Sequence, residues 1–281
     1  MPQWETVAIV GVGLIGGSLG LALRRRKLAK RVIGIARRES SAKRAVECGT
    51  VHRCGTELSS GVAKAEVVVV CTPVESIVPT VKRLAPFTPA DVIVTDAGST
   101  KKQIVSELGS SKINRTFIGS HPMAGSEKMG PEFADKNLFD GRTVVLTPTR
   151  KTPEDAQQRL QAFWESVGAE VVITTPSMHD QAVAATSHVP HLLASILSAA
   201  TPVGKWKELI ASGWRDTTRI ASGDPEIWRQ IVSQNREFIL NRLLDLEQRL
   251  ADCRQAIAEG DDRELTRILK AGKRNRDALG S

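Results

Sequence analysis

The stretch Gly11-Val-Gly-Leu-Ile-Gly16 decides the fold of this 281-residue chain. It follows the apolar run Thr6-Val-Ala-Ile-Val10 and opens a segment expected to be helical. Glycines at these spacings allow a tight turn and a close backbone approach to a pyrophosphate, and the helix N-terminus then faces the phosphates. A strand, a glycine loop and a helix in this order predict a dinucleotide-binding α/β fold with a nicotinamide cofactor.

Residues 1–175 repeat the order of strand and helix. Three further runs are rich in β-branched residues and nearly continuous in hydrophobicity, which is typical of strands buried on both faces of a parallel sheet; they are 31–36, 66–71 and 91–95. Further strands are expected at 116–119, 143–147 and 170–174, and helices near 14–28, 40–48, 74–84, 100–108 and 153–167. This order predicts an N-terminal Rossmann-type doubly wound sheet.

After Pro176 the pattern becomes helical, with helices expected at 177–200, 205–212, 225–258 and 262–278. Asp224 followed by Pro225 predicts an N-cap and first helical position. We therefore expect two domains, 1–175 for dinucleotide binding and 176–281 as an all-α substrate and dimerisation domain. Because such a bundle cannot bury all its apolar faces against one small sheet domain, homodimerisation through it is expected.

Composition excludes several classes of protein. Hydrophobic residues make up 41% and charged residues 25% of the chain, as in a globular protein. We expect no apolar run of the ~18–20 residues that span a bilayer, and the N-terminus has no signal-peptide pattern. A cytoplasmic location is therefore expected. The four cysteines form no CxxC pair, which argues against a disulfide framework and a zinc site. No metal site is expected elsewhere.

The net charge of +8 raises the question of nucleic acid. The densest basic run, Arg24–Lys27, lies where the first helix should end, and cations are favoured there by the helix dipole. Aromatic residues are only 4% of the chain and none is Tyr, so a base-stacking surface is not expected. The partner should be a small molecule.

The end of the second strand bears on the choice of cofactor. An NAD-selecting site would place an acid there, but this chain has Ala36, followed by Arg37 and Arg38. Guanidinium groups suit a 2′-phosphate, so NADP is expected to be preferred, with NAD possible. The alternative is that the arginines are ordinary surface charge and Glu39 binds the ribose.

Three more motifs follow predicted strands, where ligands bind in open α/β sheets. Cys71-Thr-Pro73 and Asp96-Ala-Gly-Ser99 follow two of the buried runs. Pro73 could instead simply start a helix, and Ser99 could cap one. His121, in Gly119-Ser-His-Pro-Met-Ala-Gly125, could act as a base near a hydride acceptor, which oxidation of a C–OH group needs.

Taken together, these motifs resemble the prephenate/arogenate dehydrogenases of tyrosine biosynthesis. Ser187-His188-Val-Pro-His191 and the segment from Trp214 through Arg219 and Asp224 to Trp228 match that family as well, in its order and over nearly the whole chain. Because the chain ends near residue 281, a single-function form without a fused mutase or regulatory domain is expected. The resemblance also implies oxidative decarboxylation of a ring-hydroxylated dicarboxylate.

The resemblance implies roles for individual residues. His121 would hydrogen-bond the ring hydroxyl and help to remove its proton, with Ser99 beside it. Arg219 would grip the ring carboxylate, and His188, Glu127, Asp216 and Trp228 would line or border the substrate pocket. His188 and His191 could in principle ligate a metal, but the family uses none. The implied cofactor-binding residues are Gly11, Gly13, Leu14, Ile15, Gly16, Arg37, Arg38, Ser41, Thr72, Pro73 and Ser99.

Some alternatives stay open at this point. Arg219 could pair with Asp216 or Asp224 on the surface, and Trp228 could be a core residue. Prephenate and arogenate differ only in a keto versus an amino group, and Glu127 favours prephenate or use of both. A β-hydroxyacid-type dehydrogenase and a redox-sensing NAD(P)-binding protein are rival classes.

Overall fold

The computed structural model describes residues 3–109, 113 and 116–280. The chain forms two compact units, Met1–Asn235 and Arg236–Ser281. This division by packing lies well after the boundary expected near residue 175, because the first helices that follow the sheet pack in the same unit as the sheet.

The first unit is built on an eight-stranded sheet with the order β3-β2-β1-β4-β5-β6-β7-β8. Its strands are β1 (Trp4–Val10), β2 (Ala29–Ile35), β3 (Arg53–Gly55), β4 (Val67–Val70), β5 (Ile93–Asp96), β6 (Phe117–Pro122), β7 (Thr143–Thr147) and β8 (Glu170–Ile173). All neighbouring strands are parallel except β6 and β7, which are antiparallel. The order reverses direction between β1 and β4, which is the switch point where ligands bind in doubly wound sheets.

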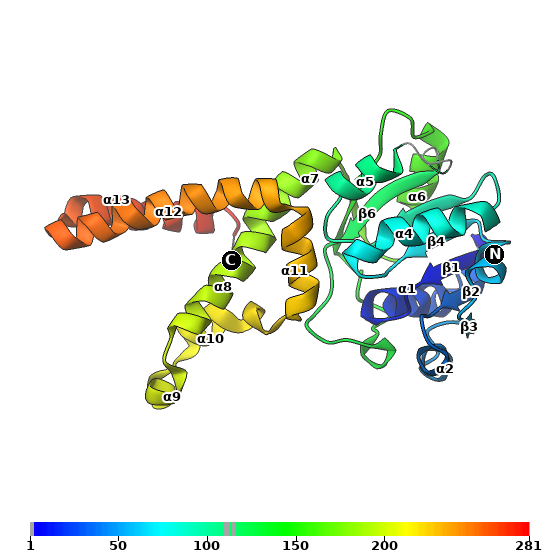
Figure 1. Ribbon diagram of the computed structural model, residues 1–281, viewed down its shortest axis with the longest axis horizontal. Coiled ribbons are helices and arrows are strands. Elements are labelled where there is room, and N and C mark those ends of the chain that lie inside the picture. Colours follow the sequence, from blue (N-terminus) through cyan, green and yellow to red (C-terminus); the bar gives the residue numbers. More distant parts are fainter. Residues whose placement is uncertain (1–2, 110–112, 114–115, 281) are drawn as a thin grey trace. The chain divides into compact units, whose positions relative to one another are not determined.

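Helices cover both faces of this sheet (Figure 1). Along β1, Val7 and Ile9 pack into one apolar core while Ala8 and Val10 pack into the other, so this central strand is buried on both faces as predicted. Side chains of α1 (Leu14–Arg25), α2 (Glu39–Glu47) and α6 (Glu154–Ser166) join the first core, and those of α3 (Leu58–Val62), α4 (Val74–Leu84) and α5 (Lys102–Leu108) join the second. Two 3₁₀ turns, η1 (Ala85–Phe87) and η2 (Pro131–Phe133), complete this part.

The stretch after the sheet begins with α7 (Pro176–Val183), a π-helical turn η3 (Ala184–His188) and α8 (Val189–Ala200). The predicted helix at 177–200 is thus interrupted by a wider turn just before Pro190, which has no backbone N–H to donate. By length and composition the stretch 176–200 could cross a membrane, contrary to our expectation that no run was long enough. Its four ionisable residues, His179, Asp180, His188 and His191, are, however, buried inside the folded unit.

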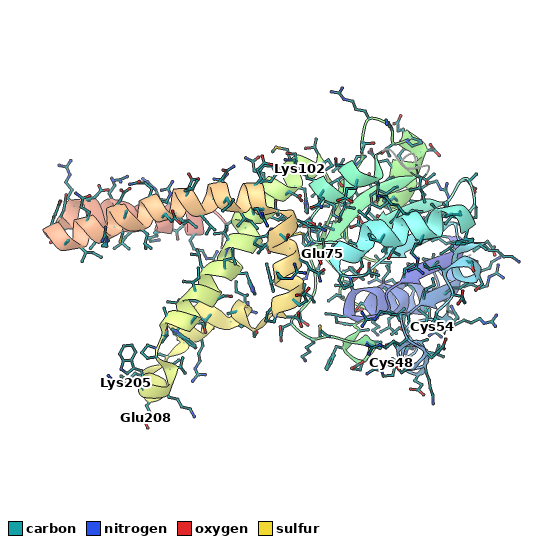
Figure 2. The ribbon with its side chains drawn as sticks, viewed as in Figure 1. Cys48, Cys54, Glu75, Lys102, Lys205 and Glu208 are labelled. Atoms are coloured by element: carbon teal, nitrogen blue, oxygen red, sulfur yellow. The ribbon has the colours of Figure 1, made fainter. Side chains whose placement is uncertain are left out.

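The unit ends with shorter helices, namely α9 (Val203–Trp206), η4 (Lys207–Leu209), α10 (Ser212–Thr218), η5 (Arg219–Ser222) and α11 (Pro225–Gln234). Asp224 caps α11 by accepting from the amides of Glu226 and Ile227, as predicted. α11 is tied to α4 through Glu75, which is labelled in Figure 2 and whose carboxylate lies 3.0 Å from the Arg229 guanidinium.

The predicted helix at 225–258 is wrong in one respect, because it is broken at Asn235. That residue leaves the helical conformation and turns its side chain inward to make hydrogen bonds. The second unit consists of α12 (Arg236–Glu259) and α13 (Asp262–Asp277), joined through Gly260, whose φ of +68° suits glycine. All four cysteines are free thiols; Cys48 and Cys54 are labelled in Figure 2.

Candidate active site

The three fingerprint glycines leave β1 and begin α1. Gly11 has a φ of +96°, and a Cβ there would lie 2.6 Å from the carbonyl oxygen of Cys71. A Cβ on Gly16 would overlap the carbonyl oxygen of Gly11. At Gly13, by contrast, a Cβ would meet nothing within 4 Å, so this backbone faces open space. Two glycines are therefore required by packing, whereas the third leaves room for a ligand.

The start of α1 fits an anionic group. Gly13 is the N-cap and provides no side-chain hydrogen bond, and the first turn, which begins with Leu14 and Ile15, contains no acidic residue. Its amides and the positive end of the helix dipole are therefore available to a pyrophosphate. Beside it, the buried hydroxyl of Thr72 has no hydrogen-bond partner in the described part of the chain. The next residue, Pro73, is the N-cap of α4, so it does start a helix.

In the segment that follows β2, Ala36 is buried and residues 37–40 are exposed. Arg37 and Arg38 both lie on the surface, and Arg38 is the N-cap of α2. Ser41 lies in the first turn of that helix and is half-buried. The Glu39 carboxylate accepts a hydrogen bond of 2.9 Å from the Thr56 hydroxyl. Arg37 and Arg38 are thus exposed to solvent, whereas the Glu39 carboxylate is already hydrogen-bonded to Thr56.

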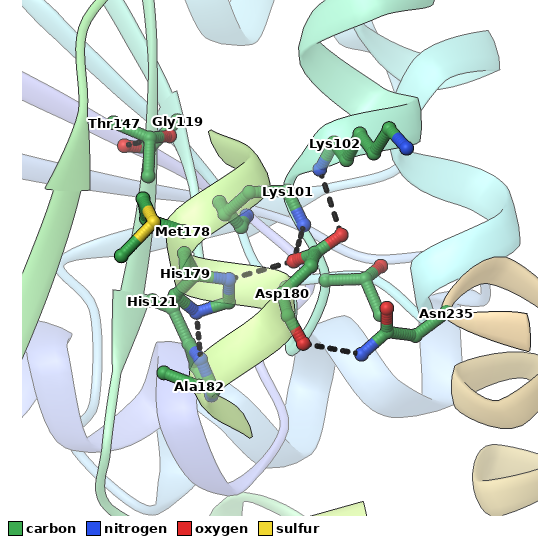
Figure 3. Close-up of polar contacts among 12 residues, drawn as sticks. Lys101, Lys102, Gly119, His121, Thr147, Met178, His179, Asp180, Ala182 and Asn235 are labelled. Carbon is green, nitrogen blue, oxygen red and sulfur yellow. Dashed lines mark hydrogen bonds and ion pairs between the residues drawn. The ribbon is translucent and has the colours of Figure 1, made fainter. Parts of the chain in front are cut away.

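The loop that carries Ser99 is held by buried charges. Asp96, at the end of β5, forms an ion pair with Lys101, and both side chains are fully buried. Ser99 does not cap α5, because the N-cap is Lys101. The amides of Lys101 and Lys102 instead donate to the Asp180 carboxylate, at 2.7 and 2.9 Å (Figure 3). Half-buried Ser99 therefore lies on a loop fixed at both ends, and the capping alternative does not apply.

His121 lies at the carboxyl end of β6 and is buried. Its Nδ1 is 2.9 Å from Nε2 of His179, and Nδ1 of His179 is 2.7 Å from the Asp180 carboxylate (Figure 3). Burial, with His179, Lys101 and His188 nearby, holds the pKa of His121 well below its usual range. His121 is therefore a neutral imidazole at neutral pH, as a base must be.

His188 lies in the π-helical turn and is also buried. Its Nδ1 is 3.0 Å from the side-chain nitrogen of Asn235, which also donates to the backbone oxygen of Asp180 at 2.8 Å. Burial, opposed by the nearby Asp180, lowers the pKa of His188 to about 4. π turns are common at functional sites because they reposition one side chain relative to the helix.

Trp228, on α11, is half-buried and packs against His188 of the π-helical turn η3 and His191 of α8. Its ring is stacked on His191, with centroids 3.5 Å apart and planes 11° apart, and is edge-on to His188 at 6.1 Å. Among the described residues no cluster of three His, Cys, Asp or Glu side chains could hold a metal ion. His188 contacts the Asn235 side chain and His191 contacts the Trp228 ring.

Family models match almost the whole chain. The nucleotide-binding domain of prephenate dehydrogenase matches residues 19–173, and the dimerization domain of prephenate dehydrogenase matches residues 175–271. The chain belongs to the prephenate dehydrogenase family. The resemblance drawn from the motifs is confirmed.

Individual relatives of this family agree with that assignment. Prephenate dehydrogenase of Bacillus subtilis is 34% identical over 98% of this chain and 76% of its own length. A crystal structure of prephenate dehydrogenase from A. aeolicus with hydroxyphenyl propionate and NAD+ has a TM-score of 0.90 at 32% identity, covering 98% of both chains. The Synechocystis arogenate dehydrogenase structure has a TM-score of 0.84 at 34% identity, covering 98% of this chain and 100% of that one.

Three residues implied by the family resemblance lie on the surface. Glu127 is on an exposed loop, Asp216 is exposed on α10, and Arg219 is exposed at the start of η5. Within the described part of the chain, Arg219 pairs with neither Asp216 nor Asp224, and Asp224 is occupied as the cap of α11. The structure therefore does not support the alternative in which Arg219 forms a surface ion pair with Asp216 or Asp224. η5 packs beside α8, the helix that carries His191.

Sequence reasoning missed His179, Asp180 and Asn235. His179 and Asp180 lie on α7, and Asn235 follows α11. All three connect residues that had been found separately, namely His121, His188 and the start of α5. A signal was present in the adjacent His-Asp pair at the start of the first helix after the sheet, but only the folded chain brings it to His121.

Proposed function

We propose that the protein is an oxidoreductase that catalyses the NAD(P)-dependent oxidative decarboxylation of prephenate to 4-hydroxyphenylpyruvate, in tyrosine biosynthesis. Family membership supports the reaction class, and two of the similar proteins are prephenate dehydrogenases. The observation that carries the proposal is His121, a buried neutral imidazole at the same sheet edge as the fingerprint glycines. This position supports a role for His121 as a base beside the proposed cofactor site.

In this proposal the side chains position and polarise the substrate. His121 accepts the proton of the ring hydroxyl through Nε2, with Ser99 beside it, and returns the proton to the phenolate oxygen after CO2 has left. Arg219 holds the ring carboxylate, and His188 and Trp228 contact the substrate from the helical side. When bound, NAD(P)+ supplies the acceptor for the hydride of the carbinol carbon. Aromatisation drives the reaction, so positioning is the main task of the protein.

The variant His121→Asn tests the proposal. We expect a loss of most of kcat, on the order of 10²–10⁴-fold, while KM stays within a few-fold, because general-base catalysis is lost but binding is kept. Prephenate-dependent formation of reduced cofactor is measured at 340 nm. Near-normal turnover in the variant would remove His121 from the mechanism. Wild-type protein that reduces no cofactor with either prephenate or arogenate would refute the function.

We infer a preference for NADP over NAD. Buried Ala36 offers no carboxylate to a ribose, Arg37 and Arg38 are exposed, and Glu39 is bonded to Thr56. We expect kcat/KM to be at least tenfold higher with NADP, and the double variant Arg37→Ala/Arg38→Ala to lose that difference. A clear NAD preference in the wild type would overturn the inference.

Arogenate is the second candidate substrate, favoured by the similarity to Synechocystis arogenate dehydrogenase. Its ammonium group would call for an acidic partner, and the proposed acids of the pocket mouth, Glu127 and Asp216, are on exposed segments. Steady-state kinetics with both substrates decides between prephenate, arogenate and use of both.

We further propose a homodimer, a cytoplasmic location and a functional division at residue 175. The family's dimerization domain covers 175–271, and α8 exposes Leu193, Ile196 and Leu197. Apolar side chains on one helix of a folded unit favour a partner surface. The four free cysteines suit a reducing compartment.

A further inference from the structure

We propose that Asp180 is a positioning residue that fixes the tautomers of two site histidines in opposite senses. Through His179 it leaves His121 with an acceptor nitrogen for the ligand, and through Asn235 it leaves His188 with a donor nitrogen. The use of these nitrogens in turnover rests on the proposed function, but the tautomers do not.

The first connection runs through the Asp180 carboxylate (Figure 3). Its Oδ1 accepts from the amide of Lys101 and its Oδ2 accepts from the amide of Lys102, so both oxygens act as acceptors. Nδ1 of His179, 2.7 Å from Oδ1, must therefore carry a proton. When His179 carries only this proton, its Nε2 is an acceptor. Its partner among the described residues is Nδ1 of His121, 2.9 Å away.

It follows that His121 carries its proton on Nδ1 and has its lone pair on Nε2. A neutral imidazole has one donor and one acceptor nitrogen, and the donor is already committed to His179. The charged and titratable groups around His121 are His179, His188 and Lys101, and the Lys101 charge is compensated by Asp96. When His121 takes up a proton, its bond to His179 is strengthened, and the Asp180 carboxylate stabilises the resulting charge.

The second connection runs through the backbone oxygen of Asp180. A carbonyl oxygen only accepts, so the bond of 2.8 Å fixes which end of the Asn235 amide faces it. The same amide nitrogen has a second N–H, and Nδ1 of His188 lies 3.0 Å from it. Nδ1 of His188 is therefore the acceptor, and Nε2 carries the proton.

The two histidines thus have complementary roles. His121 offers a lone pair, which suits a hydroxyl group, and His188 offers an N–H, which suits a carboxylate or carbonyl oxygen of the same ligand. The Asp180 carboxylate also caps α5, whose preceding loop carries Ser99. Asp180 therefore orients the two histidines, one through its carboxylate and one through its backbone oxygen, and also holds the loop that carries Ser99.

The direct test is the ring ¹⁵N spectrum of the full-length wild-type protein labelled at its five histidines. Single His→Gln variants assign the resonances. We expect His121 as the Nδ1–H tautomer and His188 as the Nε2–H tautomer at pH 7.5. The opposite tautomer at His121 would mean that a doubly protonated His179 donates to it, and it would overturn the proposal. This measurement needs no variant at Asp180 and no substrate.

Variants then test the two connections separately. Asn235→Leu should shift His188 towards a mixture of tautomers and raise KM at least fivefold, with kcat and the His121 resonances little changed. His179→Leu should lower kcat by at least tenfold and shift the acid limb of the pH profile of kcat/KM. His179→Gln, whose side-chain oxygen can still accept from His121, should restore much of that loss.

His52→Gln is the matched control, because His52 is an exposed histidine whose Nδ1 accepts from the Val32 amide on β2. It should change neither kcat nor the other resonances. If both His179 variants were equally active with unchanged pH profiles, His179 would have no positioning role. Expected tautomers in a protein that does not turn over prephenate would refute the proposed function and leave this inference standing.

Discussion

At the scale of single residues, His188 links the site to stability. Its pKa is about 4 in the folded protein and 6.5 in the unfolded chain, so between these values only the unfolded chain binds the proton. The free energy of unfolding should therefore fall as the pH is lowered through this window. His188 contributes about 1.4 kcal/mol for each pH unit, and its contribution is fully present above pH 6.5.

Urea titrations of the wild type and of His188→Gln at several pH values between 4.5 and 7.5 measure this contribution. The free energy of unfolding of the variant should change less steeply with pH, by the equivalent of about one bound proton. It should still depend on pH, because the other buried histidines still titrate. If the free energies of unfolding of the two proteins changed with pH in parallel, His188 would not stay neutral while the fold is intact.

The site could be predicted from the sequence only where a residue lies in a local motif. The fingerprint glycines and Ser99 follow strands, His121 lies at the carboxyl end of one, and these strand ends meet at one sheet edge. His179 is 58 positions from His121 and lies on another element. The bond between them is a product of tertiary packing, and no spacing in the sequence encodes it.

At the scale of elements, the glycine loop contains two kinds of glycine. Gly16→Ala should destabilise the protein by about 1–3 kcal/mol, because its Cβ would overlap the Gly11 carbonyl. Gly13→Ala should cost less than about 1 kcal/mol, since its Cβ meets no protein atom, yet it should raise the KM for cofactor at least tenfold.

Thermal melts and cofactor titrations of these two variants provide the comparison, each serving as the control for the other. A Gly13→Ala protein with unchanged cofactor affinity would contradict the assignment of the open space at Gly13 to the pyrophosphate.

The buried strands could be predicted because runs of β-branched residues are typical of strands. The shortest elements could not be predicted. β3 is only Arg53–Gly55 and α3 only Leu58–Val62, too short for either periodicity to appear. The antiparallel direction of β7 could have been predicted from the sequence. A parallel crossover normally contains a helix, and the segment between β6 and β7 has only the 3₁₀ turn η2. The break at Asn235 arises from its bonds to Asp180 and His188.

At the scale of the whole molecule, the proposed homodimer depends on the apolar surface of α8. Ile196 is 60% exposed there, with Leu193 and Leu197 on the same helix. Ile196→Glu should weaken association at least 100-fold, because a carboxylate would be buried without a partner. Sedimentation velocity at micromolar concentration should show a dimer for the wild type and a monomer for the variant.

The matched control is Leu250→Glu on α12, where the side chain is 73% exposed. If it too dissociated the dimer, the interface would extend to the second unit. If the wild type were monomeric at these concentrations, the proposed dimer would be refuted.

The burial of Lys101 makes this residue a natural reporter of local opening. Its ammonium pairs with Asp96 and has no exposed surface, so an acylating reagent in solution can reach it only when this part of the protein opens. Exposed Lys43 should react at once under the same conditions. The rate at which Lys101 is acylated, followed by peptide mass spectrometry, therefore gauges how often the loop that carries Ser99 comes apart in the native protein.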